Sequence, residues 1–200
     1  MKLVGITQRV VIDPRHGERR DALDQRWWSL LRESGICAVP IPNQPQFATE
    51  FAAAVSLSGI IFSGGNDLAY YGGDAPERDA TEASLLRWAR DGRVPVLGVC
   101  RGMQMILHSF GVPLHRATGH VTSAHPVTVD NKERSVNSYH GFVARESSPD
   151  LEACGWASDG TVEAVRHQGE RIGGIMWHPE RNAPFDSLDV RFICDFFGEK

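Results

Sequence analysis

This chain has few cysteines, no long apolar run and no excess of positive charge. Its cysteines show no Cys-x-x-Cys or other metal-ligand spacing. No apolar run approaches the ~20 residues of a membrane span, and the N-terminal apolar stretch reaches Gln8 and Arg9 too soon for a signal peptide. A formal net charge of −4 gives no general affinity for nucleic acid or for an anionic membrane. We therefore predict a cytoplasmic protein with reduced thiols and with no nucleic-acid or membrane partner.

The composition is that of an ordinary folded domain. The chain has 200 residues, of which 42% are hydrophobic and 23% charged, enough for one sizeable core. No repeat, low-complexity run or linker divides it, so we predict a single domain over residues 1–200. A homo-oligomer is among the states that the sequence allows.

Short apolar strands alternate with amphipathic helices up to residue 111. The expected strands are 2–7, 36–41, 59–62 and 94–97, and the expected helices are 18–34, 47–55, 81–90 and 103–110, with a loop over 10–17. This alternation predicts an α/β fold with a doubly wound, mostly parallel sheet and flanking helices. Beyond residue 112 the helix signals fade, which predicts a small antiparallel extension. Further strands at 151–157, 161–167 and 172–177 and a closing helix at 188–197 complete the pattern.

Residues 98–102 read Gly-Val-Cys-Arg-Gly and fall where an expected strand turns into an expected helix. Glycine two residues before and after Cys100 is the pattern of a nucleophile on a tight strand-to-helix turn. The helix N-terminus would favour the thiolate, and the Arg101 N–H would point to where an oxyanion forms. Taken alone, the pattern also fits a small buried cysteine without a catalytic role.

A second strand end supplies the partners that a nucleophilic cysteine needs. The apolar residues 173–177 lead into His178, and Glu180 follows one proline later. A thiol requires a base, and the base requires a carboxylate that orients it. We therefore predict Cys100, His178 and Glu180 as a catalytic triad.

The two motifs together, GVCRGMQ at residues 98–104 and WHPE at 177–180, resemble the class I glutamine amidotransferase family, whose triad is Cys-His-Glu. The resemblance spans nearly the whole chain. It implies that residues 63–67 (Ser-Gly-Gly-Asn-Asp) form an oxyanion loop in which the Gly65 N–H acts beside the Arg101 N–H. It also implies a reaction that needs no metal or organic cofactor.

The same resemblance implies a pocket for a γ-glutamyl group. Gln104 matches the family glutamine that helps hold this group, and residues 136–140 match the segment that runs along it. The substrate-binding residues expected from this segment are Asn137, Ser138, Tyr139 and His140.

Residues 63–71 and 136–140 resemble the corresponding loops of the stand-alone γ-glutamyl hydrolases of the family. Residues 5–9 and 16–28, with the small overall size, resemble the members that cleave γ-glutamyl-CDP-amidate, so this resemblance implies the same reaction here. That reaction releases glutamate and cytidine diphosphoramidate for the phosphoramidate decoration of capsular polysaccharide. Two alternatives stay open: another γ-glutamyl amine such as γ-glutamyl-GABA, or a glutaminase subunit that supplies ammonia to a separate synthase.

A nucleotide leaving group needs a phosphate-binding site, and the N-terminal segment offers arginines for one. Arginine forks suit phosphate oxygens, so Arg9 and Arg19 are expected substrate-binding residues. The alternative is that these arginines are solvated surface charges offset by neighbouring acidic residues.

Three histidines, His115, His120 and His125, recur at five-residue intervals. None has a cysteine or carboxylate nearby at metal-ligand spacing. We predict that they are surface residues and that the protein has no metal site.

Overall fold

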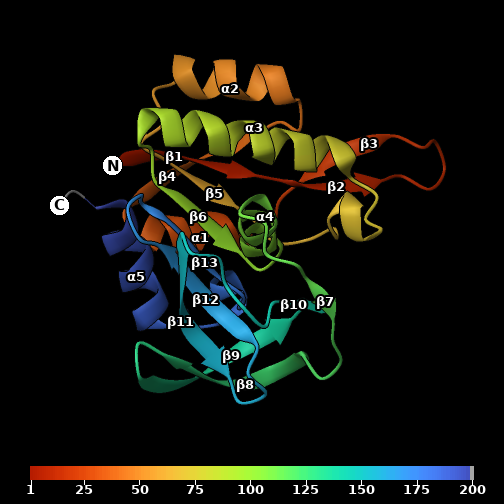
Figure 1. The fold of residues 1–200 in the computed structure, drawn as a ribbon. Helices are drawn as coiled ribbons and strands as arrows, with labels where there is room; N and C mark the ends of the chain where they lie inside the picture. The colour runs from red at the N-terminus through yellow and green to blue at the C-terminus, as the bar shows by residue number, and fades with distance from the viewer. Residues whose placement is uncertain (199–200) are drawn as a thin grey trace.

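A nine-stranded sheet with helices on both faces organises residues 1–198, the part of the chain that the computed structural model describes (Figure 1). Its strand order is β4-β1-β5-β6-β13-β12-β11-β8-β9. The strands are β1 (Lys2–Thr7), β4 (Ile36–Ile41), β5 (Gly59–Phe62), β6 (Val96–Val99), β8 (Val121–Val129), β9 (Lys132–Tyr139), β11 (Leu151–Ala157), β12 (Val162–His167) and β13 (Ile172–Ile175). Two small two-stranded sheets pair β2 (Arg9–Ile12) with β3 (Arg19–Ala22) and β7 (His115–Arg116) with β10 (Phe142–Val143).

The sheet has a parallel half and an antiparallel half. Strands β4, β1, β5, β6 and β13 pair in parallel, whereas β13, β12, β11, β8 and β9 pair antiparallel. The predicted doubly wound α/β fold with an antiparallel extension is therefore confirmed. No helix within residues 1–198 is both long and apolar enough to cross a bilayer.

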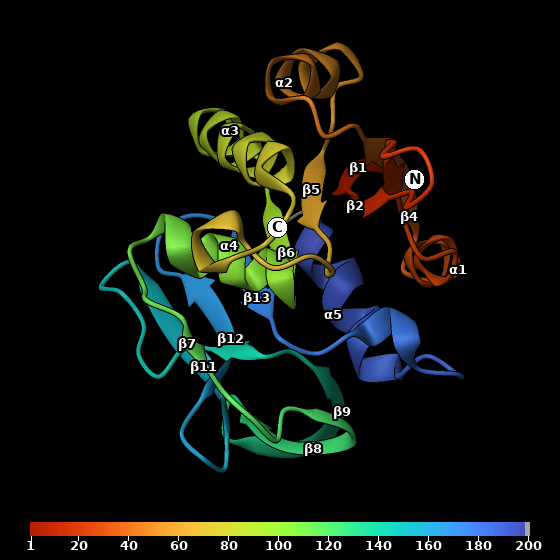
Figure 2. The same ribbon diagram turned by 90° about the vertical axis from the view of Figure 1, so that its right-hand side faces the viewer.

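The helices divide between the two faces of the parallel half (Figure 2). They are α1 (Arg26–Glu33), α2 (Pro45–Ala54), α3 (Pro76–Gly92), α4 (Arg101–Ser109) and α5 (Ser187–Phe197), with short 3₁₀ helices η1 (Ala69–Tyr71) and η2 (Pro179–Arg181). Side chains of α2, α3 and α4 form one hydrophobic core with the sheet, and those of α1 and α5 form a second core on its other face. Burying an apolar stripe of each helix on a sheet face is the packing that the doubly wound pattern predicts.

The N-terminal segment differs from its prediction. Instead of a loop over 10–17 and a helix over 18–34, the chain forms the β2–β3 hairpin and begins α1 only at Arg26. The hairpin turn is closed by Asp13, whose backbone N–H donates to the Glu18 carbonyl, and by Gly17 at φ +68°. These local turn bonds compete with helix formation, and charge spacing in the sequence does not reveal them.

Helix α3 begins five residues before its predicted start, at Pro76 rather than Thr81. Proline at the first helical position is favourable because its missing N–H has no helical partner. The added first turn carries Arg78, which is fully buried. A buried charge breaks the apolar pattern from which the helix was predicted.

Strand register brings the predicted catalytic segments together. In the parallel pairing of β6 with β13, Val99 lies opposite Ile175, so Cys100 and His178 leave adjacent strands at the same edge. On the other side of β6, Phe62 pairs with Gly98, which places the loop that begins at Ser63 beside Cys100. This carboxyl edge is where doubly wound sheets bind ligands.

Candidate active site

Cys100 occupies a strained turn between β6 and α4. Its backbone has φ 53° and ψ −108°, which side-chain-bearing residues rarely adopt, and its N–H donates to the Ile175 carbonyl over 2.7 Å. A Cβ at Gly98 would lie 2.5 Å from the Met103 nitrogen, and one at Gly102 would collide with the Phe62 carbonyl. Both flanking glycines are thus required because the strand and the helix approach so closely.

His178 follows β13 and contacts both other members of the predicted triad. Its Nδ1 lies 2.7 Å from Glu180 Oε1, and its ring is close enough to Cys100 for the sulfur to raise the pKa of the imidazole. A Cβ at Gly64 would lie 2.6 Å from His178 Cε1, so the glycine loop packs directly on the imidazole. Bonding of Nδ1 to Glu180 directs Nε2 to the sulfur, the tautomer that a base for Cys100 needs.

The electrostatics favour a charged imidazole. Burial by itself lowers the pKa of His178, but the adjacent Cys100 sulfur and the Glu180 carboxylate outweigh burial and raise the pKa to about 9. At neutral pH the imidazolium is therefore the dominant form. An imidazolium hydrogen-bonded to a cysteine is the arrangement that stabilises a nucleophilic thiolate.

Asn137 anchors the backbone of His178. Its Oδ1 accepts from the His178 N–H over 2.9 Å, and its Nδ2 donates to the His178 carbonyl over 2.8 Å and to Asn182. The side chain is buried. Both ends of the amide are thus engaged by other residues of the chain, and Asn137 holds the backbone of His178 in place.

Arg78 shapes the loop at residues 63–67. Its guanidinium donates to the carbonyls of Ser63, Gly64 and Gly65. In a trans peptide, the C=O of one residue and the N–H of the next point in opposite directions. Holding the Gly64 carbonyl toward Arg78 therefore turns the Gly65 N–H to the opposite side of the loop, and Gly65 itself lines the pocket.

The N–H of Arg101 is directed by the same geometry. The Cys100 carbonyl accepts the first bond of α4, from the Gln104 N–H over 3.1 Å. The Arg101 N–H, on the other side of that peptide, points out of the N-terminal end of α4 and has no helical acceptor. It is thus suited to an oxyanion at the sulfur's acylation site.

A buried ionic network underlies both N–H donors, and sequence reasoning missed it. Glu82 accepts from Thr7 Oγ1 over 2.7 Å, from Arg78 Nε over 3.1 Å and from the Arg101 guanidinium, which also pairs with Asp79. Burial lowers the pKa of Arg78 to about 10, with a further decrease from Arg101 and a partial increase from Glu82, so Arg78 stays cationic at neutral pH. The i,i+4 spacing of Arg78 and Glu82 was the available signal.

A pocket of about 300 Å³ opens above Cys100. It is lined by predicted site residues and by three others: Gly65, Cys100, Arg101, Gln104, Tyr139 and His140, together with Asn66, Asp67 and Gly141. Its volume lies at the small end of ligand pockets. Asp67 is exposed, and its carboxylate has no hydrogen-bond or ion-pair partner among residues 1–198.

Residues 136–140, the segment predicted to run along the γ-glutamyl group, have side chains both at the pocket and away from it. Ser138 is buried and donates from Oγ to the His120 carbonyl over 2.7 Å, so its hydroxyl points away from the pocket. Tyr139 lies at the pocket, with its ring 5.9 Å from the ring of His178 and the Arg181 guanidinium over it. Gln104 donates from Nε2 to the Phe142 carbonyl over 3.2 Å.

The two arginines expected to contact phosphate have different environments. Arg9 begins β2 and lies over the loop, because a Cβ at Gly65 would come within 2.9 Å of its Nε. Its guanidinium has no hydrogen-bond or ion-pair partner within the described residues. Arg19 is at the far end of the hairpin, where it donates to Glu77 over 2.6 Å and to the Asp74 carbonyl over 2.7 Å. Arg9 alone of the two has a guanidinium available to a ligand.

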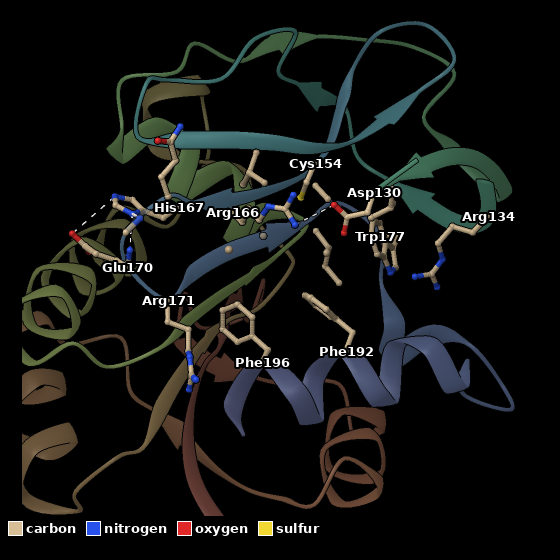
Figure 3. Close-up of a pocket in the computed structure, with 18 residues that line it drawn as sticks. Asp130, Arg134, Cys154, Arg166, His167, Glu170, Arg171, Trp177, Phe192 and Phe196 are labelled. Atoms are coloured by element: carbon tan, nitrogen blue, oxygen red, sulfur yellow. Dashed lines mark hydrogen bonds and ion pairs between the residues drawn. The ribbon is translucent and has the colours of Figure 1, made fainter. Parts of the chain in front are cut away.

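A larger cavity, about 510 Å³, lies elsewhere, between the antiparallel strands and α5 (Figure 3). Phe192 and Phe196 of α5 point into it, as does Arg166 of β12. Its one cysteine is Cys154, and burial raises the pKa of that thiol to about 11. The cavity contains neither Cys100 nor His178 and is not the site of the predicted chemistry.

The known proteins that this chain resembles are glutamine amidotransferases and related hydrolases. The model of the family "Glutamine amidotransferase class-I" matches residues 21–187. The chain is 30% identical to γ-glutamyl-CDP-amidate hydrolase of Campylobacter jejuni, with 94% of each chain covered. It is 29% identical to a glutamine-hydrolysing GMP synthase subunit of Thermococcus kodakarensis, over 87% of this chain and 93% of the relative. The crystal structure of a glutamine amidotransferase from Thermotoga maritima shares the fold, with a TM-score of 0.71 at 19% identity, over 92% of this chain and 78% of that one.

Proposed function

Because this chain belongs to the class I glutamine amidotransferase family, we propose that it is a cysteine-dependent hydrolase of γ-glutamyl amide bonds. The observation that carries the proposal is the contact of one imidazole with both Cys100 and Glu180, at a pocket lined by Gly65 and Arg101. Nucleophile, base, orienting carboxylate and two candidate oxyanion donors are the parts that acyl transfer requires.

The proposed reaction proceeds through a thioester. The Cys100 thiolate attacks the γ-carbonyl carbon, and the N–H groups of Gly65 and Arg101 bind the resulting oxyanion, each worth ~3 kcal/mol. The imidazolium of His178 gives its Nε2 proton to the leaving nitrogen, and the C–N bond breaks. His178 then takes a proton from the attacking water, the thioester is hydrolysed, and glutamate leaves.

The pocket charges fit a γ-glutamyl group joined to an anionic amine. The unpaired carboxylate of Asp67 suits the substrate's α-ammonium. The unpaired guanidinium of Arg9 stands beside Gly65, one of the residues that line the pocket. An arginine fork there suits phosphate oxygens.

We assign γ-glutamyl-CDP-amidate as the substrate, with glutamate and cytidine diphosphoramidate as products in a pathway to phosphoramidate-decorated capsule. Support comes from the relative that bears this activity in its name and matches over 94% of both chains, and from Arg9. The likeness to a GMP synthase subunit favours a second candidate, a glutaminase that passes ammonia to a separate synthase.

We expect the purified chain, acting alone, to release glutamate from γ-glutamyl-CDP-amidate with a kcat/KM at least ~10-fold above that for glutamine, the effect of one charge-assisted contact. Glutamate release from both compounds, and from γ-glutamyl-GABA, is measured at equal concentrations. Faster glutamate release from γ-glutamyl-GABA would contradict the assignment of the nucleotide substrate and favour another γ-glutamyl amine. Release from glutamine only after a synthase is added would establish the glutaminase subunit instead.

Arg9→Ala is expected to raise KM for γ-glutamyl-CDP-amidate roughly 10-fold, because a hydrogen-bonded charge pair with phosphate is lost, and to leave KM for glutamine unchanged. Arg19→Ala is the matched control, since the Arg19 guanidinium is already bound to Glu77. Steady-state kinetics of both variants on both compounds are the measurement. An equal rise for the two substrates would contradict phosphate contact by Arg9.

A further inference from the structure

Three buried histidines converge on one buried glutamate behind the wall of the catalytic pocket. His120 precedes β8, His125 lies within it, His140 follows β9, and Glu163 is on β12. The nearest ring nitrogens lie 3.6, 3.5 and 3.6 Å from Glu163 Oε1, in that order. Glu163 is fully buried, and none of the histidines is more than 9% exposed.

The outer nitrogens of two of these rings are held by acceptors. His120 Nε2 lies 3.0 Å from Asp159 Oδ2, and His140 Nδ1 lies 3.1 Å from the Phe142 carbonyl. An acceptor there places the proton of a neutral imidazole on the outer nitrogen and leaves a lone pair on the inner one. Both inner lone pairs then face the Glu163 carboxylate. A carboxylate or carbonyl on the outer nitrogen is also the usual support for a metal-binding histidine.

The inner atoms have no hydrogen-bond partner within residues 1–198. These orphaned atoms are His120 Nδ1, His125 Nε2, His140 Nε2 and both oxygens of Glu163. Buried polar groups are almost always paired, and an unpaired buried charge is costly. Five such atoms in one cluster indicate that a partner belongs between them, and a cation would satisfy the carboxylate and the nitrogen lone pairs together.

We infer that His120, His125 and Glu163 bind a divalent transition metal ion, zinc foremost, with His140 beside them. Two ligands of a tetrahedral zinc, with metal–ligand bonds near 2.1 Å, lie about 3.4 Å apart, close to the observed 3.5–3.6 Å between nitrogen and oxygen. The ligand atoms of His120, His125 and Glu163 also lie within 4.8 Å of one another. Imidazole and carboxylate are the donors that suit zinc.

Protons on the inner nitrogens are the competing explanation. An N–H···O bond joins its heavy atoms over 2.7 to 3.2 Å, whereas all three separations here are at least 3.5 Å. The separations of 3.5–3.6 Å between the ring nitrogens and Glu163 Oε1 are too long for direct hydrogen bonds and match two ligands of one ion. The cluster is buried, so an ion in it would be closed off from solvent, as is typical of a structural metal.

The position of the site links it to the pocket. The His120 carbonyl accepts from Ser138 Oγ over 2.7 Å and from the His140 N–H over 3.2 Å. These bonds hold the end of β9, where Tyr139 and His140 line the pocket above Cys100. An ion at Glu163 would therefore link β8 to β12 across the intervening β11 and order one wall of the pocket.

The prediction that the recurring histidines lie on the surface is correct for His115 and wrong for His120 and His125, which are buried. The ligand that the sequence pattern lacked is Glu163, which reaches the histidines only because β12 and β8 both flank β11. Spacing along the chain cannot reveal such a partner.

We expect about one zinc ion per chain by elemental analysis of the full-length protein after gel filtration, as a closed site predicts. Chelation with dipicolinate should lower Tm, and added Zn²⁺ should restore it. Both readouts use the wild-type chain and are independent of hydrolase activity, so they hold whichever substrate the enzyme has. A metal-free protein whose Tm responds neither to chelator nor to Zn²⁺ would overturn the site.

The variants His125→Gln and Glu163→Gln are each expected to abolish stoichiometric zinc and the response of Tm to Zn²⁺. The matched control is His115→Gln, which removes an exposed histidine outside the cluster and should keep the full zinc content. Zinc retained by both cluster variants but lost from His115→Gln would place the ion at the surface and refute the proposal. If a cluster variant fails to fold, the wild-type measurements still decide.

Discussion

We expect Cys100→Ala to abolish glutamate release, by roughly 10⁶-fold if the triad behaves as in other acyl-transfer enzymes, and to leave the fold intact. The variant loses the sulfur that forms the thioester, and no neighbouring side chain replaces it. Alanine keeps the Cβ, so the strained backbone at φ 53° carries no new clash. Activity is measured by glutamate release and folding by Tm and circular dichroism.

The matched control for this prediction is Cys194→Ala, which removes an exposed cysteine on α5. We expect full activity from it, and we expect iodoacetamide to inactivate the control as fast as the wild type. Full activity of a folded Cys100→Ala protein would remove the proposed mechanism altogether.

We expect Glu180→Gln to lower kcat by roughly 10⁴-fold, as for the corresponding change of carboxylate to amide in a serine-protease triad, and to shift the pH profile. Glu180 is one of the groups that raise the pKa of His178 from 6.5 to about 9. In the wild type, activity should fall as pH rises through about 9, because the imidazolium that protonates the leaving nitrogen is lost. In the variant this alkaline limb moves toward lower pH.

The matched control here is Glu170→Gln, since Glu170 is another glutamate near a histidine, His167, but pairs with Arg90 away from the pocket. It should retain the wild-type pH profile. An unchanged alkaline limb in Glu180→Gln would show that Glu180 does not set the pKa of His178.

The same pKa shift affects stability. A histidine whose pKa is raised in the folded state stabilises the fold fully below its unfolded value of 6.5. This contribution is lost as pH rises through about 9. Stability and activity should therefore decline together on the alkaline side.

The parallel half of the fold and the motif around Cys100 could be read from the sequence because both are local. A strand followed within a few residues by a helix, with glycine on both sides of a cysteine, is set by short-range sterics: a Cβ at Gly102 collides with Phe62 whatever the rest of the chain does. The apolar periods of the strands and helices are local in the same sense.

The N-terminal hairpin and the start of α3 escaped prediction because polar interactions override the apolar pattern there. Arg78 is buried on the helix face that periodicity assigns to apolar residues, and only Glu82 and the loop carbonyls above it satisfy its charge. A hydropathy pattern has no means of representing a buried ion pair.

Tertiary structure alone decided which predicted residues meet and what each one faces. Residue order was enough for the fold class and for the identity of Cys100, His178 and Glu180 as candidates. The register of β6 with β13 brought them together, and Asn137 holds the backbone of His178 in place. The convergence of three histidines on Glu163 also arises only from strand order. The physical reason is the same in each case. Local steric constraints depend on residues that are close in the sequence, whereas the pairing of buried polar groups depends on strands that lie far apart in the chain.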